Sequence, residues 1–277
     1  MSGNITIHRA IASINGVRFF YLDTGTDKPV MLCLHGRWGR ALTWHNFIGR
    51  YADRYRIIAP DQRGHGLTDK PDGGYSPAEM ADDAYNLLKY LGCNEAIVVG
   101  HSMGGKIAAF LTDRHPRMVK AVAILDVSAI DTGEEPLTSL SPDDDGLTRD
   151  WPTPFATYQE AVDFLTLTFG RETSVQYFLE SLVETAEGFD FMFSRKALAA
   201  IHATRGGWPD ILPRLKCPVC LVRATESIFF TSAQASQMRE LIGDCTYFEV
   251  SDSDHMVYED NPEEFNAGFD AFLQKVK

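Results

Sequence analysis

The chain has 277 residues, of which 44% are hydrophobic and 11% aromatic, enough to bury a large core in one compact domain. The formal charge of −12 and the pI near 5.1 disfavour a nucleic-acid partner, because phosphate binding needs clustered Lys and Arg and no segment carries such a cluster. No apolar run approaches the ~18 residues of a membrane span, and residues 1–11 lack the basic and apolar regions of a signal peptide.

These features predict a cytoplasmic protein with no membrane partner, and we expect it to be a monomer or homodimer. The five cysteines are an odd number in a chain too long to need disulfides, which fits a reducing compartment. The eight histidines show no spacing typical of metal ligands. We therefore expect neither a metal ion nor a cofactor.

The predicted strands are eight short runs rich in β-branched and apolar residues. In chain order they are Thr6–Ile11, Val17–Asp23, Val30–Leu34, Arg56–Pro60, Ala96–Gly100, Val119–Asp126, Val219–Val222 and Thr246–Val250. Helical patterns separate the later runs. This alternation indicates the α/β class, with a mostly parallel sheet covered by helices on both faces.

Two predicted helices carry clear start signals. Ser76–Glu79 is a capping box with proline at the first helical position, and the amphipathic stretch that follows runs to Leu91. Asn261–Glu264 starts a C-terminal helix in the same way. Apolar residues recur at helical spacing in that helix and are expected to pack in the core: Phe265, Phe269 and Phe272.

The alternation of strands and helices breaks between residues 130 and 209. This stretch contains two helix-like segments rich in Phe, Leu and Tyr, Phe155–Phe169 and Ser174–Thr185. We predict a core formed by residues 1–131 and 209–277. A helical cap, residues 132–208, is predicted to be inserted after the sixth strand.

The sharpest motif is G-H-S-M-G-G at residues 100–105, directly after a predicted strand and before a helix-like stretch. A tight strand-to-helix turn needs glycine where a Cβ would clash with neighbouring backbone. Such a turn would project Ser102 above the carboxyl edge of the sheet. A serine hydroxyl needs a base to take its proton and hydrogen-bond donors to stabilise the oxyanion.

His255 follows the last predicted strand after a short polar loop, and no other histidine late in the chain could serve as the base. Further motifs follow the third, fourth and last strands: L-H-G-R-W at 34–38, D-Q-R-G-H-G at 61–66 and S-D-H at 253–255. In order and spacing, these motifs resemble those of the α/β-hydrolase family, serine-nucleophile branch, over nearly the full chain. The resemblance implies that the backbone N–H groups of Arg37 and Met103 form an oxyanion hole. We expect His35 and His65 to bond backbone carbonyls and so to organise their loops.

The acid that orients the base is the difficult assignment. The family pattern has an Asp just after the seventh strand, but Ser227 or Ile228 stands at that position. Asp126 ends the sixth strand at the same edge as Ser102, where some family members have their acid. Glu226 lies one residue before the usual position and is the alternative acid. We favour Asp126, because a strand end holds a carboxylate more firmly than a loop does.

The resemblance also implies that the cap covers the nucleophile and shapes the pocket. Arg37 could bind a substrate carboxylate or pair with the acidic surface, and Trp38 and Trp208 are further candidates for substrate contact. An aromatic-rich cap favours a small, partly apolar substrate over a polymer. Other aromatic candidates for the pocket wall are Phe155, Phe164, Phe169, Tyr177, Phe178, Phe191 and Phe193.

Three functions are compatible with these residues. The leading hypothesis is hydrolysis of a small-molecule ester, lactone or amide through an acyl-serine, because epoxide hydrolases and haloalkane dehalogenases of this fold use Asp in place of Ser102. The second is a carbon–carbon bond hydrolase or cofactor-free dioxygenase acting on an aromatic-degradation intermediate, since one fold hosts many reactions. The third is a non-catalytic ligand sensor on the same fold.

Overall fold

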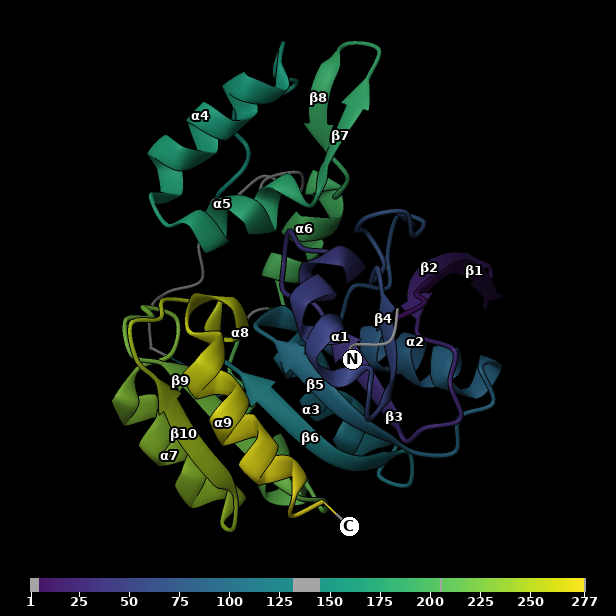
Figure 1. Ribbon diagram of the computed structural model, residues 1–277, viewed down its shortest axis with the longest axis vertical. Helices are drawn as coiled ribbons and strands as arrows, with labels where there is room; N and C mark the ends of the chain where they lie inside the picture. The colour runs from purple at the N-terminus through teal and green to yellow at the C-terminus, as the bar shows by residue number, and fades with distance from the viewer. Residues whose placement is uncertain (1–4, 132–144, 205, 277) are drawn as a thin grey trace.

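The computed structural model describes residues 5–131, 145–204 and 206–276, and within them eight strands form one sheet (Figure 1). The spatial order is β1-β2-β4-β3-β5-β6-β9-β10. The pairs β1·β2 and β2·β4 are antiparallel, and all other neighbours are parallel. The strands are β1 (His8–Ile14), β2 (Val17–Asp23), β3 (Val30–Leu34), β4 (Arg56–Pro60), β5 (Ala96–His101), β6 (Val119–Leu125), β9 (Val219–Ala224) and β10 (Thr246–Val250).

The predicted eight-stranded, mostly parallel sheet is confirmed. Each predicted range overlaps an observed strand, and the largest shift is at the first, which begins at His8 and not at Thr6. The carboxyl ends of the parallel strands meet at one edge of the sheet, which is where ligands bind in folds of this class.

Helices cover both faces of the sheet (Figure 1). Alternate strand residues point to opposite layers, as Leu32 and Met31 of β3 do. The predicted capping box is confirmed, because Ser76 and Glu79 exchange hydrogen bonds. One layer contains α2 (Pro77–Tyr90), α3 (Met103–Arg114), α7 (Ser232–Ile242) and the 3-10 helix Pro209–Arg214. The other contains the 3-10 helix Ala41–Trp44, α1 (His45–Tyr51), α8 (Val257–Asp260) and α9 (Pro262–Leu273), with the predicted phenylalanines Phe265, Phe269 and Phe272 buried.

Most of the chain between β6 and the 3-10 helix Pro209–Arg214 forms a separate group of elements at one end of the sheet (Figure 1). These elements are α4 (Tyr158–Phe169), α5 (Glu172–Leu179), β7 (Leu182–Thr185), β8 (Gly188–Phe191) and α6 (Arg195–His202). Their aromatic and aliphatic side chains form a hydrophobic cluster of their own, which Met256 from the core joins. Residues 132–144 of the predicted cap lie outside the described residues.

The predicted helix over Ser174–Thr185 is wrong in its second half. Helix α5 ends at Leu179, and residues 182–185 pair with β8 in a hairpin. The hairpin accommodates these residues, because Val183 and Thr185 are β-branched and Gly188 has a φ of 133° that only glycine adopts readily. Among the described residues, no helix is both long and apolar enough to cross a bilayer.

Candidate active site

Ser102 lies on the sharp turn between β5 and α3. Its backbone angles, φ 52° and ψ −118°, are rare for a residue with a side chain. The turn needs glycine on both sides. A Cβ on Gly100 would lie 2.1 Å from the Gly104 carbonyl oxygen, and one on Gly104 would lie 2.0 Å from the Leu34 carbonyl oxygen. This turn places Ser102 on the wall of a cavity above the sheet.

The imidazole of His255 is held by the carboxylate of Asp126. His255 Nδ1 lies 2.7 Å from Asp126 Oδ2, and because a carboxylate only accepts, the imidazole proton is on Nδ1 and Nε2 is the basic atom. Asp126 directly follows β6 and is fully buried. Its Oδ1 accepts the Ala224 N–H at 2.9 Å, and its Oδ2 accepts the Ser227 hydroxyl at 2.6 Å. These donors compensate for the burial of the carboxylate and fix its position.

The alternative acid, Glu226, pairs with an arginine. Its Oε2 lies 2.5 Å from Arg171 Nη2, and about half of its side chain is exposed. Arg171 also donates to the carbonyl of Asp252 at 2.8 Å, in the loop that leads to the histidine. The structure therefore brings Asp126 to His255 and leaves Glu226 paired with an arginine.

The loop after β3 carries one of the two backbone N–H groups that the resemblance assigns to an oxyanion hole. Arg37 and Met103 both line the cavity that contains the serine. The Tyr177 hydroxyl donates to the Arg37 carbonyl at 3.2 Å, and the Ser181 hydroxyl donates to the Trp38 carbonyl at 2.7 Å. Two side chains of the insertion thus fix the peptide groups of this loop. Met103 is the first residue of α3, where an N–H has no partner within the helix.

The buried histidines of the two nearby loops bond backbone, as the sequence predicts. His35 Nδ1 donates to the Gly36 carbonyl at 2.8 Å, and its Nε2 accepts the Gln62 N–H at 2.9 Å. His65 Nδ1 lies 3.0 Å from the Arg63 carbonyl. Burial lowers the pKa of His35 well below its ordinary value and that of His65 to about 4. Both rings are therefore neutral at pH 7.

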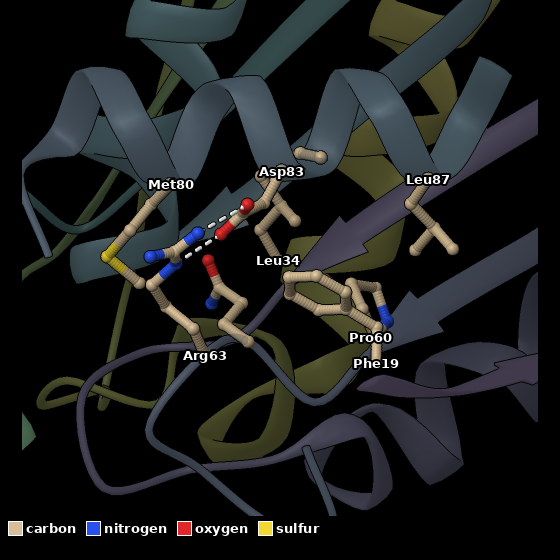
Figure 2. Close-up of a pocket in the computed structure, with 9 residues that line it drawn as sticks. Phe19, Leu34, Pro60, Arg63, Met80, Asp83 and Leu87 are labelled. Carbon is tan, nitrogen blue, oxygen red and sulfur yellow. Dashed lines mark hydrogen bonds and ion pairs between the residues drawn. The ribbon is translucent and has the colours of Figure 1, made fainter. Parts of the chain in front are cut away.

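The loop after β4 is anchored on α2 by an ion pair (Figure 2). Arg63 donates to both carboxylate oxygens of Asp83, with 2.6 Å between Nη2 and Oδ1. A cavity of about 10 Å³ lies beside the pair. Such a volume holds at most one water molecule, so this is not a substrate site.

Two cavities meet at Ser102 and His255. The α3 cavity, about 300 Å³, is lined along α3 by Met103, Lys106 and Ile107 and reaches Trp208. The α5 cavity, about 460 Å³, lies against Phe169, Ser174, Tyr177 and Phe178. Both volumes are typical of small-molecule sites. The residues that line both cavities are Arg37, Trp38, Ser102, His202, Phe229 and His255.

The predicted pocket residues divide between lining and packing. Phe169, Tyr177, Phe178 and Trp208 line a cavity. Trp38 lines both cavities and donates from Nε1 to Asp145 at 2.8 Å. The remaining aromatic candidates lie in the cluster of the insertion: Phe155, Phe164, Phe191 and Phe193.

The pocket residues that the sequence analysis did not single out include Phe229, His202 and Lys106. The Phe229 ring lies 4.5 Å from the His255 ring, measured between centroids, and His202 ends α6. Neither carries a motif, because the folding of the insertion and of the loop after β9 brings them to the site. Lys106 carried a signal, since a cation in the first turn of a helix opposes the helix dipole. In the described parts of the chain, no group of three or more His, Cys, Asp or Glu could hold a metal ion.

The strand order, the helices on both faces and the serine turn define an α/β-hydrolase fold. Residues 31–267 match the model of the alpha/beta hydrolase family, and the chain belongs to that family of hydrolases.

Named relatives agree with this assignment. The chain is 29% identical to 2-(acetamidomethylene)succinate hydrolase of Mesorhizobium japonicum over 241 residues, 85% of this chain and 84% of the relative. It is 38% identical to a soluble epoxide hydrolase of Corynebacterium sp. (strain C12), but over 128 residues, 46% of this chain and 43% of the relative. Among solved structures, that of E-2-(acetamidomethylene)succinate hydrolase superposes with a TM-score of 0.88 at 25% identity, covering 97% of this chain and all of that one.

Proposed function

We propose that the protein hydrolyses a small-molecule ester, lactone or amide through an acyl-enzyme on Ser102. In this proposal His255 is the general base and Asp126 is the acid that orients it. The observation that carries the proposal is the 2.7 Å contact between His255 and the buried Asp126, beside a cavity that Ser102 also lines. A strained serine, a tautomer-fixed imidazole and a buried carboxylate are the parts that acyl transfer requires.

The reaction begins when Ser102 Oγ attacks the substrate carbonyl and His255 Nε2 takes the hydroxyl proton. The carbonyl oxygen gains negative charge, which the N–H groups of Arg37 and Met103 stabilise, each by about 10²–10³ in turnover. His255 then gives the proton to the leaving alcohol or amine as its bond to carbon breaks. A water molecule, activated by the same imidazole, hydrolyses the acyl-serine and restores the enzyme.

Similarity over most of both chains to a 2-(acetamidomethylene)succinate hydrolase supports this class of reaction, because that relative is named for a small molecule with an amide bond. The similarity to the epoxide hydrolase covers less than half of this chain. A serine at position 102 departs from the aspartate nucleophile of that branch, which favours acyl chemistry over epoxide opening.

The test is covalent labelling with a fluorophosphonate probe, read by mass spectrometry of the intact protein and its peptides. The wild type and the Ser128→Ala variant should gain one label, on the peptide that contains Ser102. Ser128 is the control because it lines the same cavity and its hydroxyl already donates to the Ile130 carbonyl at 3.0 Å. Labelling that persists in Ser102→Ala would refute the proposal.

A panel of short-chain p-nitrophenyl esters, lactones and anilides separates the alternatives. Turnover that disappears in Ser102→Ala supports acyl hydrolysis. Oxygen uptake with a heteroaromatic substrate, in place of ester turnover, would replace hydrolysis by oxygenolysis. A protein that is neither labelled nor active on any member of the panel would be a ligand sensor.

A further inference from the structure

The α3 cavity has a positive lining in a protein of net charge −12. Of the described residues that line it, none is Asp or Glu. Its ionisable residues are Arg37, Tyr75, Lys106, His202 and His255. The α5 cavity differs, since its wall also includes Asp145, Glu226 and Asp254. The two branches of the pocket therefore offer different electrostatic environments on either side of the serine.

Lys106 is placed where a positive charge is costly. It lies in the first turn of α3, whose N-terminal end carries a partial positive charge of its own. Burial lowers the pKa of Lys106 to about 8, although the charge of Asp131 opposes this effect. Its Nζ donates to the carbonyls of Thr204 and Gly206, at 2.6 and 3.0 Å. These neutral oxygens hold the ammonium group at the cavity wall without neutralising it.

Arg37 extends the positive lining to the junction of the two cavities, where His202 also lies. Arg37 Nη1 lies 2.6 Å from His202 Nδ1, and because a guanidinium only donates, the His202 proton is on Nε2. The Arg37 guanidinium also stacks on the Trp38 ring, 4.0 Å from its centroid. The arginine side chain is thus held in place, and Arg37 and Lys106 both line the α3 cavity together with Ser102.

We propose that the α3 cavity is a carboxylate-binding subsite and that the substrate is a small carboxylic acid carrying a second, hydrolysable acyl bond. This inference rests on the proposed function, because it places the scissile bond at Ser102. The free carboxylate binds between Lys106 and Arg37, and the rest of the molecule extends into the α5 cavity. An anion there offsets both the burial of the ammonium group and its position at the helix N-terminus.

The probes are glutarate and its uncharged analogue glutaramide, which have the same length. Their binding to the Ser102→Ala protein is measured by calorimetry, so the result does not depend on turnover. We expect glutarate to bind at least about tenfold more tightly than glutaramide. Equal affinity for the two probes would overturn the proposal, even if fluorophosphonate labelling had already established the acyl-serine chemistry.

Three lysine variants separate charge from tethering. Lys106→Gln can still donate to the carbonyls of Thr204 and Gly206 but has no charge, so glutarate affinity should fall at least about tenfold. Lys106→Arg keeps the charge and should remain within about threefold. Lys120→Gln is the matched control, because Lys120 pairs with Glu95 on the surface at 3.2 Å.

A thermal unfolding curve for each variant shows that it is folded before binding is measured. If Lys106→Gln does not fold, the comparison of the two probes on Lys106→Arg still tests the proposal. A loss of glutarate affinity in Lys120→Gln as large as in Lys106→Gln would also overturn it.

Discussion

Asp126→Asn tests the orientation of the imidazole with little change of shape. The carboxylate accepts three hydrogen bonds: the Ala224 N–H on Oδ1, and the Ser227 hydroxyl and His255 Nδ1–H on Oδ2. An asparagine has one oxygen and one NH2 group. Because the buried Ala224 N–H needs an acceptor, the amide oxygen takes the place of Oδ1 and the NH2 group faces the imidazole.

The expected loss follows from the tautomer that this NH2 group imposes. His255 Nδ1 would have to accept a hydrogen bond, so the ring proton moves to Nε2, the atom that should take the proton of Ser102. In the general Ser-His-Asp mechanism this exchange lowers turnover about 10⁴-fold. That factor corresponds to about 5.4 kcal/mol in the activation free energy.

The assay is kcat for the most active p-nitrophenyl ester, compared among the wild type, Asp126→Asn and Glu226→Gln. Glu226→Gln should cost no more than a few-fold, because that carboxylate pairs with Arg171 at 2.5 Å. If Asp126→Asn kept a tenth of the activity, or if Glu226→Gln lost more than Asp126→Asn, the assignment of the acid would be wrong.

Three further predictions concern the surroundings of this site. Ser227→Ala removes a hydrogen bond to a carboxylate and should lower kcat about tenfold with KM within about twofold, whereas an equal change of KM would contradict a positioning role. Gly104→Ala puts a Cβ against the Leu34 carbonyl oxygen and should lower the free energy of unfolding by about 3 kcal/mol in urea titrations. A Cβ on Gly49 would meet no atom within 4 Å outside its own helix, so Gly49→Ala should raise the free energy of unfolding by about 0.4–1 kcal/mol. Equal changes in the free energy of unfolding for the two variants would contradict the clash at Gly104. Lys106 has its pKa lowered from 10.5 to about 8, so between these pH values the unfolded chain binds the extra proton and the free energy of unfolding should rise with pH. A rise of the same size in Lys106→Gln would show that another group causes it.

The strands could be predicted because each is a local pattern. Runs such as Val30–Leu34 and Arg56–Pro60 are read from their own residues and appear at the same bounds in the structure. The hairpin after α5 could not be found in the same way. The helical spacing of apolar residues in Ser174–Leu179 continues into Leu182–Thr185, and the choice between helix and hairpin there depends on packing within the insertion.

The site residues that belong to a contiguous sequence motif could be predicted. Those that come together only in the folded chain left more than one candidate. The turn around Ser102 is contiguous, because the glycines that it needs, Gly100 and Gly104, lie within two residues of the serine. The choice between Asp126 and Glu226 depends on the pairing of β6 with β9, which sets Leu125 beside Val222 and brings the Ala224 N–H to the Asp126 carboxylate. Lys106 and His202 meet in the α3 cavity only because the insertion folds over the sheet.

Ser227, which stands where the family pattern has an acid, donates its hydroxyl proton to Asp126 at 2.6 Å. Two carboxylates at one imidazole would repel each other, and in this chain the position after β9 holds a serine and not an acid. A serine there does more than leave room. Its hydroxyl donates to the same Asp126 oxygen, Oδ2, that contacts His255. The hydroxyl oxygen also accepts the Phe229 N–H at 3.1 Å, and the Phe229 ring packs against the imidazole. The loop that carries the acid in the family pattern therefore holds Asp126 in place here and positions Phe229. The loop after β9 thus carries both the serine that replaces the usual acid and the aromatic ring that lines the pocket beside His255. A related chain with Ser or Thr at the position of Ser227 should have its acid at the position of Asp126.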